Sequence, residues 1–292
     1  MLLSAVILAA VAAVVLVAAG GFLTYRIVTQ VNTTENVTPE SFLLSNFESL
    51  SFTDQRGVDH EGWLLRGLKG APVVVLSHGY DSNRSEMLSV ATVLQENHFN
   101  VYVFNYRGTK PKSLTTDMGG RETAVLADAV DSLLKMPGVN TNRIGLYGKN
   151  VGGYAVMQVA AKNPVVKAIA VDNVYDQPID MFNTEIDQVL GSTKLFRVIM
   201  DAQFRLLNFG SKPAPVSEIL PKLDSIPKYF ISGRDTPLLS KATEGFYERA
   251  AQPKQLLLMD HTQPGLMNGT EKKEYENQIL FFFLQNLPLR AD

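Results

Sequence analysis

The sequence contains no cysteine among its 292 residues. This absence excludes disulfide bonds, a thiolate nucleophile, and zinc or iron–sulfur sites that depend on cysteine ligands. The chain also lacks an excess of charge, because 27 basic and 29 acidic residues give a formal net charge of −2. No general cationic surface is therefore expected for a nucleic acid partner. We therefore expect that the protein binds no metal, no other cofactor and no nucleic acid.

Charged residues are also missing from the N-terminal segment. Residues 2–25 form an uncharged run rich in alanine, valine and leucine. At a helical rise of about 1.5 Å per residue, this run would extend roughly 36 Å, enough to cross a bilayer. The sequence therefore predicts a single-pass membrane anchor over residues 1–26, with the lipid bilayer as a partner. A cleaved signal peptide is the alternative, because Val-Ala-Ala at residues 17–19 resembles a cleavage site.

A polar segment follows the anchor. Residues 27–46 are expected to form a linker. They contain no lysine or arginine, whereas acidic residues recur from Glu35 to Asp54. Because basic residues favour the cytoplasmic side of a membrane, their scarcity after Arg26 favours an outward-facing domain.

Beyond residue 46, apolar runs of strand length alternate with segments of helical periodicity. The strand-like runs lie at 73–76, 101–104, 143–147, 166–171, 228–231 and 255–259, and the helical segments at 87–95, 122–134, 151–161, 241–250 and 271–284. This alternation predicts an α/β domain over residues 47–290, with a mostly parallel sheet and helices on both faces. Residues 49–65 are expected to form an antiparallel hairpin that leads into the sheet.

One segment interrupts the alternation. Residues 176–221 contain no strand signal, but their apolar residues recur near helical spacing. In open α/β folds ligands bind at the carboxyl edge of the sheet, so this segment is expected to be a helical, lid-like insertion over that edge. Ordinary core helices, or a face that rests on the membrane, are the alternatives.

The strongest chemical motif lies between a strand and a helix. Residues 148–152 read Gly-Lys-Asn-Val-Gly, which matches the G-x-S-x-G nucleophile elbow except that Asn150 replaces the serine. The glycines are needed because side chains two positions from the centre of this sharp turn would collide with the neighbouring strand and helix. Asparagine suits the centre, since it tolerates a positive φ better than most residues.

Other motifs follow in the order expected of one family. They are SHGYDSNRSE at residues 77–86, FNYRG at 104–108, SGRDTPL at 232–238 and MDHT at 259–262. Together with the elbow, they make the chain resemble the α/β-hydrolase superfamily, and more narrowly its membrane-anchored members of the serine-aminopeptidase or dienelactone-hydrolase type. The sequence departs from the family at Asn150 and at Asp260, where a small residue usually precedes the histidine.

The chain order of a catalytic triad in this fold is nucleophile, acid, base. His261 is the only one of the four histidines that follows an acid candidate in this order, so it is the predicted base. Asp235, directly after a predicted strand, is the predicted acid, and Asp172 is the rival acid. The predicted oxyanion-hole donors are the backbone N–H groups of Tyr80 and Val151.

The asparagine decides what activity can be expected. A carboxamide nitrogen is delocalised into its carbonyl, so Asn150 cannot serve as a histidine-activated nucleophile. Serine-type hydrolysis of ester, amide or thioester bonds should therefore be weak or absent, and replacing Asn150 with serine should restore it through His261. A hydrolase that acts on a small acyl ester, amide or peptide-like ligand, and a non-catalytic binding or scaffold protein (a pseudoenzyme), both remain open.

Overall fold

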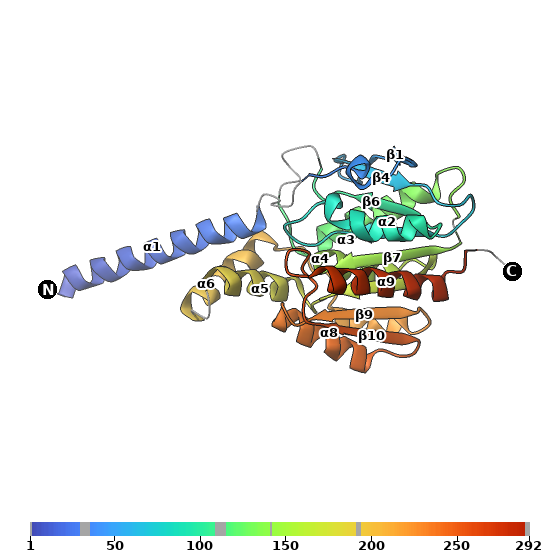
Figure 1. The fold of residues 1–292 in the computed structure, drawn as a ribbon. Helices are drawn as coiled ribbons and strands as arrows, with labels where there is room; N and C mark the ends of the chain where they lie inside the picture. The colour runs from blue at the N-terminus through green and yellow to red at the C-terminus, as the bar shows by residue number, and fades with distance from the viewer. Residues whose placement is uncertain (1, 30–35, 109–114, 141, 191–193, 290–292) are drawn as a thin grey trace.

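The N-terminal helix projects from the rest of the molecule (Figure 1). The computed structural model describes residues 2–29, 36–108, 115–140, 142–190 and 194–289. Helix α1 (Leu2–Val28) is long and apolar enough to cross a membrane. Its last residues, Ile27 and Val28, are buried in the hydrophobic core of the domain. The helix thus extends two residues past the boundary expected at residue 26, and its end contacts the domain; residues 30–35 of the expected linker lie outside the described residues.

Within the described residues, eight strands form one sheet in the order β1-β4-β6-β5-β7-β8-β9-β10. Their bounds are β1 (Phe47–Ser49), β4 (Gly62–Leu65), β5 (Val73–Ser77), β6 (Asn100–Phe104), β7 (Ile144–Lys149), β8 (Val166–Asp172), β9 (Lys228–Gly233) and β10 (Lys254–Met259). Strands β1 and β4 pair antiparallel, as do β4 and β6, and all the other neighbours are parallel. A separate antiparallel pair, β2 (Phe52–Thr53) and β3 (Asp59–His60), completes the predicted hairpin region.

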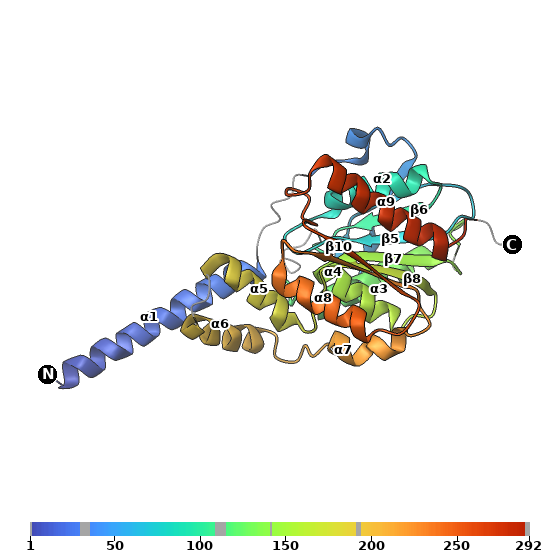
Figure 2. The same cartoon turned by 60° about the horizontal axis from the view of Figure 1, so that its bottom comes forward.

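Helices cover both faces of the sheet (Figure 2). A hydrophobic cluster joins one face to α2 (Leu88–Glu96) and α9 (Gly269–Asn286). A larger cluster joins the other face to α3 (Gly120–Leu134), α4 (Val151–Ala160) and α8 (Pro237–Arg249). The central strands are buried on both sides, which explains their nearly continuous apolar sequences.

The insertion between β8 and β9 is helical, as predicted. It contains α5 (Pro178–Leu190), α6 (Lys194–Leu207), α7 (Val216–Ile219) and the 3₁₀ helix η4 (Leu220–Leu223). Helices α5 and α6 pack together, and α6 also packs against α1 (Figures 1 and 2). The insertion therefore joins the projecting helix to the carboxyl edge of the sheet.

This edge collects the ends of six parallel strands. Strands β6, β5, β7, β8, β9 and β10 end at Phe104, Ser77, Lys149, Asp172, Gly233 and Met259. Because the strands are parallel and adjacent in the sheet, the loops that follow them lie at the same edge. All the motifs singled out in the sequence lie in or beside these loops.

Candidate functional site

Asn150 occupies a sharp turn between β7 and α4. Its φ is 34° and its ψ is −101°, a strained conformation for a residue with a side chain. The flanking glycines permit the turn: a Cβ on Gly148 would lie 2.4 Å from the carbonyl carbon of Gly152, and one on Gly152 would lie 2.4 Å from the Ser77 oxygen. At the predicted elbow, residues 148–152, a strand, a sharp turn centred on an asparagine and a helix thus follow one another.

The side chain of Asn150 fills the expected oxyanion position. Its Oδ1 accepts hydrogen bonds from the backbone N–H of Tyr80 at 2.7 Å and of Val151 at 2.6 Å. These are the two N–H groups that the sequence predicts as oxyanion donors, and they converge on one atom. The carboxamide oxygen therefore stands where a substrate carbonyl would have to bind.

Asp235 lies in the loop after β9, beside the loop that follows β10. Its Oδ2 accepts the backbone N–H groups of Thr262 at 3.0 Å and Gln263 at 2.9 Å. Its Oδ1 has no hydrogen-bond partner among the described residues. The carboxylate thus fixes the backbone of the loop that was expected to carry the base, and it makes no bond to His261.

The predicted pair of Asp235 and His261 is wrong for this structure. His261 Nδ1 lies 3.1 Å from Oε1 of Glu271, and the His261 side chain is 42% exposed. Glu271 belongs to the capping box that begins α9, where its other oxygen accepts the backbone N–H of Asn268. Because the N–H groups of the next two residues are held by Asp235, the loop turns Thr262 inward and His261 outward.

Gln263 lines the cavity beside Asn150 and follows the backbone held by Asp235. His261 is not among the residues that line this cavity. The two residues after His261 that line this cavity are thus Thr262 and Gln263, and neither side chain has a proton-accepting nitrogen near neutral pH. Sequence reasoning missed Gln263 because an uncharged amide in a loop carries no catalytic signal.

A buried ion pair between Lys149 and Glu86 lies next to Asn150 in the sequence and stabilises the turn. Lys149 Nζ lies 3.0 Å from Oε1 of Glu86 and donates to the Thr262 carbonyl at 3.0 Å. Burial alone would raise the pKa of Glu86, but the Lys149 ammonium and hydrogen bonds outweigh it and lower that pKa. The pair connects the elbow to the segment after β5 and to the loop after β10.

Asp172, the rival acid, ends β8 and is fully buried. Its Oδ2 accepts the Tyr275 hydroxyl at 2.7 Å, and its Oδ1 has no partner among the described residues. Burial raises the pKa of Asp172 to about 6, although Lys149 opposes the shift. No hydrogen bond connects Asp172 to His261 in the described part of the chain, so neither acid candidate orients that histidine.

A cavity of about 460 Å³ opens beside Asn150. The elbow, the loop after β10 and helix α5 form its walls, and α5 contributes Met181, Thr184, Glu185 and Gln188. Burial, and then the nearby Asp81, raise the pKa of Glu185 to about 7. The insertion therefore contributes one wall of the cavity, which fits the lid-like role expected of it.

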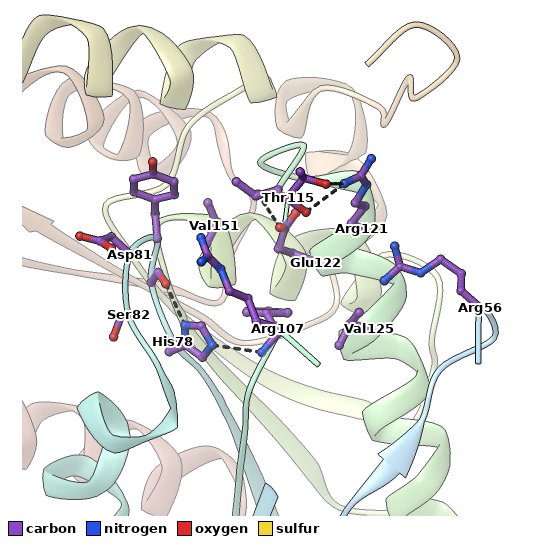
Figure 3. Close-up of a pocket in the computed structure, with 14 residues that line it drawn as sticks. Arg56, His78, Asp81, Ser82, Arg107, Thr115, Arg121, Glu122, Val125 and Val151 are labelled. Atoms are coloured by element: carbon purple, nitrogen blue, oxygen red, sulfur yellow. Dashed lines mark hydrogen bonds between the residues drawn. The ribbon is translucent and has the colours of Figure 1, made fainter. Parts of the chain in front are cut away.

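A smaller cavity of about 40 Å³ lies on the other side of the Tyr80 loop, with Arg107, Glu122 and His78 among its lining residues (Figure 3). His78 Nε2 accepts the Tyr106 N–H at 3.1 Å, so its Nδ1 carries the proton and donates to the Gly79 carbonyl at 2.8 Å. Burial lowers the pKa of His78 to about 4. This neutral histidine stabilises the Tyr80 loop, because both of its ring nitrogens form hydrogen bonds with the backbone.

The fold has solved counterparts. The Pyrococcus furiosus esterase Pf2001 aligns with 90% of this chain and 99% of its own, with a TM-score of 0.70 and 18% identity. A dienelactone hydrolase from Anabaena variabilis aligns with 83% of this chain and 100% of its own, with a TM-score of 0.61 and 17% identity. The chain has the α/β-hydrolase fold.

Two further comparisons cover most of the chain. A membrane phospholipase A, described as a bacterial virulence factor, aligns with 98% of this chain and 98% of its own, with a TM-score of 0.60 and 17% identity. The uncharacterised protein YfhR of Escherichia coli K12 is 25% identical over 252 residues, which cover 82% of this chain and 81% of YfhR. No family model matches the sequence.

Proposed function

We propose that this protein is a membrane-anchored binding protein that keeps the pocket of an α/β-hydrolase without its serine-type chemistry. The observation that carries the proposal is the position of Asn150 Oδ1 on the N–H groups of Tyr80 and Val151. An acyl-enzyme route needs a nucleophile at this residue and a vacant oxyanion hole beside it. The asparagine removes the first and fills the second.

The makeup of the cavity wall supports the same proposal, because none of the described residues that line it is a histidine. His261 pairs with Glu271 at the start of α9, and the residues of the same loop that line the cavity include Thr262 and Gln263. Triads without a nucleophile retain an acceleration on the order of 10³ to 10⁴ over water, which rests on binding and electrostatics. Any hydrolysis of esters, amides or thioesters by the native protein would therefore be weak.

The ligand class follows from the groups that remain. The backbone N–H groups of Tyr80 and Val151 prefer a carbonyl oxygen, and the 460 Å³ cavity has room for a small molecule. A small acyl ester, amide or peptide-like ligand would place its carbonyl on these groups after the Asn150 side chain rotates away. Asn150 would then act as an internal competitor of the ligand.

The anchor is the second part of the proposal. Helix α1 is 27 residues long, about 40 Å at the helical rise, and large apolar residues along most of it are exposed. Buried Thr24, Ile27 and Val28 fasten its last turns to the domain. These contacts favour a retained anchor over a cleaved signal peptide, because cleavage near residue 19 would leave a short helical stub in the fold.

The test compares the native chain with an Asn150→Ala variant, both purified in detergent with α1 intact. Neither should hydrolyse fluorogenic acetyl, butyryl or octanoyl esters faster than the weak rate expected of a triad without a nucleophile. The alanine variant should bind a non-hydrolysed short-chain amide more tightly, because no side-chain carbonyl then competes for the two N–H groups. Turnover by the native protein that the alanine variant loses would overturn the proposal.

Intact-mass analysis of the protein in the membrane fraction tests the anchor, and an N-terminus near Gly20 would contradict it.

A further inference from the structure

Helix α6 carries an apolar stripe that faces solvent. Val198 is 66% exposed and Leu206 is 75% exposed, and exposed Ala202 lies between them. Residues four apart on a helix lie on one face, so these three side chains form a continuous row. An apolar row of this kind on a surface helix needs a partner other than water.

The opposite side of α6 is already used by the domain. Met200 and Phe204 are buried, and the Phe204 ring stacks on Phe182 of α5 with centroids 4.3 Å apart. The helix therefore cannot rotate to bury the stripe without breaking this packing. The row of Val198, Ala202 and Leu206 faces outward as a consequence of the fold.

A third side of α6 contacts α1. Gln203 Nε2 donates to the Val17 carbonyl at 2.9 Å, and the Thr24 hydroxyl donates to Gln203 Oε1 at 3.3 Å. A Cβ on Gly20 would lie 3.1 Å from Cγ2 of Ile199. Helices α1 and α6 lie side by side (Figure 2). Ile199 and Gln203 each follow a residue of the stripe by one position, about 100° around α6, so the side of α6 that contacts α1 borders the stripe.

The contact lies at a defined depth along α1. A hydrocarbon core of about 30 Å takes up roughly 20 helical residues, so a span that begins at Leu2 ends near Gly21. The residues of α1 that touch α6 lie between Val17 and Thr24. Helix α6 therefore lies at the level where the hydrocarbon ends and the headgroups begin.

We propose that α6 is a second membrane contact, which lies in the surface of the bilayer beside α1 and inserts Val198, Ala202 and Leu206 among the lipids. The inference rests on the proposed anchoring by α1. The stripe and the exposed apolar residues of α1 flank the same α1–α6 contact, so one bilayer can cover both. Exposed Arg205 borders the stripe on the side away from α1, where it can meet lipid phosphates, as is typical of interfacial helices.

The position of α6 has a consequence for the cavity. Helix α5, which packs against α6, supplies Met181 and Glu185 to the cavity wall. The wall of the ligand cavity is therefore one helix away from the lipid surface. An amphiphilic ligand could pass from the bilayer to the cavity along the insertion, without first dissolving in water.

Because the native chain has no cysteine, single-cysteine labels report on one position each. We would label Val198→Cys and Leu206→Cys with an environment-sensitive dye in the full chain, reconstituted in phosphatidylcholine–phosphatidylglycerol vesicles that contain spin-labelled lipid. The matched control is Phe281→Cys on α9, a residue that is 53% exposed. A label at Val11→Cys within α1 reports whether the anchor is inserted.

Quenching at residues 198 and 206 should exceed quenching at residue 281 by at least about twofold, because the apolar face of an interfacial helix is buried roughly 5–10 Å into the boundary between headgroups and acyl chains. If the residue 11 label is quenched while residues 198 and 206 match residue 281, the second contact is wrong and the anchor stands. If the residue 11 label is not quenched, anchoring by α1 fails. Disulfide-linked dimers through residue 198 without lipid quenching would also overturn the proposal, in favour of a second copy of this chain.

Discussion

The Tyr80 hydroxyl donates a hydrogen bond to the Ile27 carbonyl at 2.5 Å. The backbone N–H of the same tyrosine donates to Asn150 Oδ1. Burial raises the pKa of Tyr80 far above its ordinary value, so the hydroxyl keeps its proton and can donate throughout the physiological range. One residue thus connects the end of the N-terminal helix to the centre of the candidate site.

Replacement of Tyr80 with phenylalanine should loosen this connection. The Ile27 carbonyl would lose its side-chain donor, and we expect the free energy of unfolding to fall by about 1 kcal/mol. Hydrogen exchange at the Tyr80 amide should become faster, because the loop loses its tie to α1. The control is Tyr25→Phe, at a residue that is 61% exposed. Equal amide exchange in both variants would show that the hydroxyl does not position the loop.

Replacement of Asn150 with serine alone should give little activity, contrary to the expectation from the sequence. His261 is held by Glu271 outside the cavity, so the new hydroxyl would lack a base. Adding Gln263→His introduces an imidazole at a residue that lines the cavity and whose backbone N–H is bonded to Asp235. We expect the double variant to hydrolyse a short acyl ester on the order of 10² times faster than the single one.

The control for the double variant adds Asp235→Asn, which should remove most of the gain, because the acid orients and stabilises the imidazole. Initial rates with a fluorogenic ester measure each variant. If Asn150→Ser is active by itself and His261→Ala abolishes that activity, His261 is the base after all.

Replacement of Lys149 with methionine should be strongly destabilising. It leaves Glu86 charged in the interior, with only hydrogen bonds to compensate it. Breaking a buried ion pair from one side typically costs about 3–5 kcal/mol. Adding Glu86→Gln should recover much of the loss, because the uncompensated charge is then gone. Urea unfolding of both variants checks this, and equal instability of the two would show that packing, not charge, is responsible.

Replacement of Asp172 with asparagine should change how stability depends on pH. Burial raises the pKa of Asp172 from 3.8 to about 6, so the folded protein holds this proton more tightly than the unfolded chain. The native protein should therefore lose about 3 kcal/mol of stability from this group as pH rises from about 4 to 7. The Asp172→Asn variant would carry no such dependence, because a carboxamide does not titrate in this range. Urea unfolding of both proteins at several pH values measures the difference, and a difference that stays constant would contradict the assignment.

The fold and the sharp turn at Asn150 were predictable because their causes are local. Buried parallel strands need apolar runs, and the turn at Asn150 needs Gly148 and Gly152, whose missing side chains leave room for the neighbouring backbone. The orientation of His261 was not predictable. In an irregular loop, neighbouring side chains face different ways, and here the backbone bonds to Asp235 decide that His261 faces Glu271.

The position where α1 ends, and its packing against the domain, were also not predictable from the sequence. Composition predicts the length of an apolar helix, but its packing depends on residues distant in sequence, such as Gln203 against Val17. The segment expected as a linker therefore begins within the core, at Ile27 and Val28.

The close approach of Gly20 to Ile199 makes helix α1 specific to its own domain. The Cβ of an alanine at residue 20 would lie 3.1 Å from Ile199 Cγ2 and 3.2 Å from Gln203 Oε1; a smaller side chain at residue 199 would relieve the first contact, and a shift of the flexible Gln203 side chain would relieve the second. The two positions should therefore change together among related proteins. A chimera that exchanges the whole of α1 for an unrelated membrane helix would still reach the bilayer, but it would lose the bonds that Gln203 and Tyr80 make to α1.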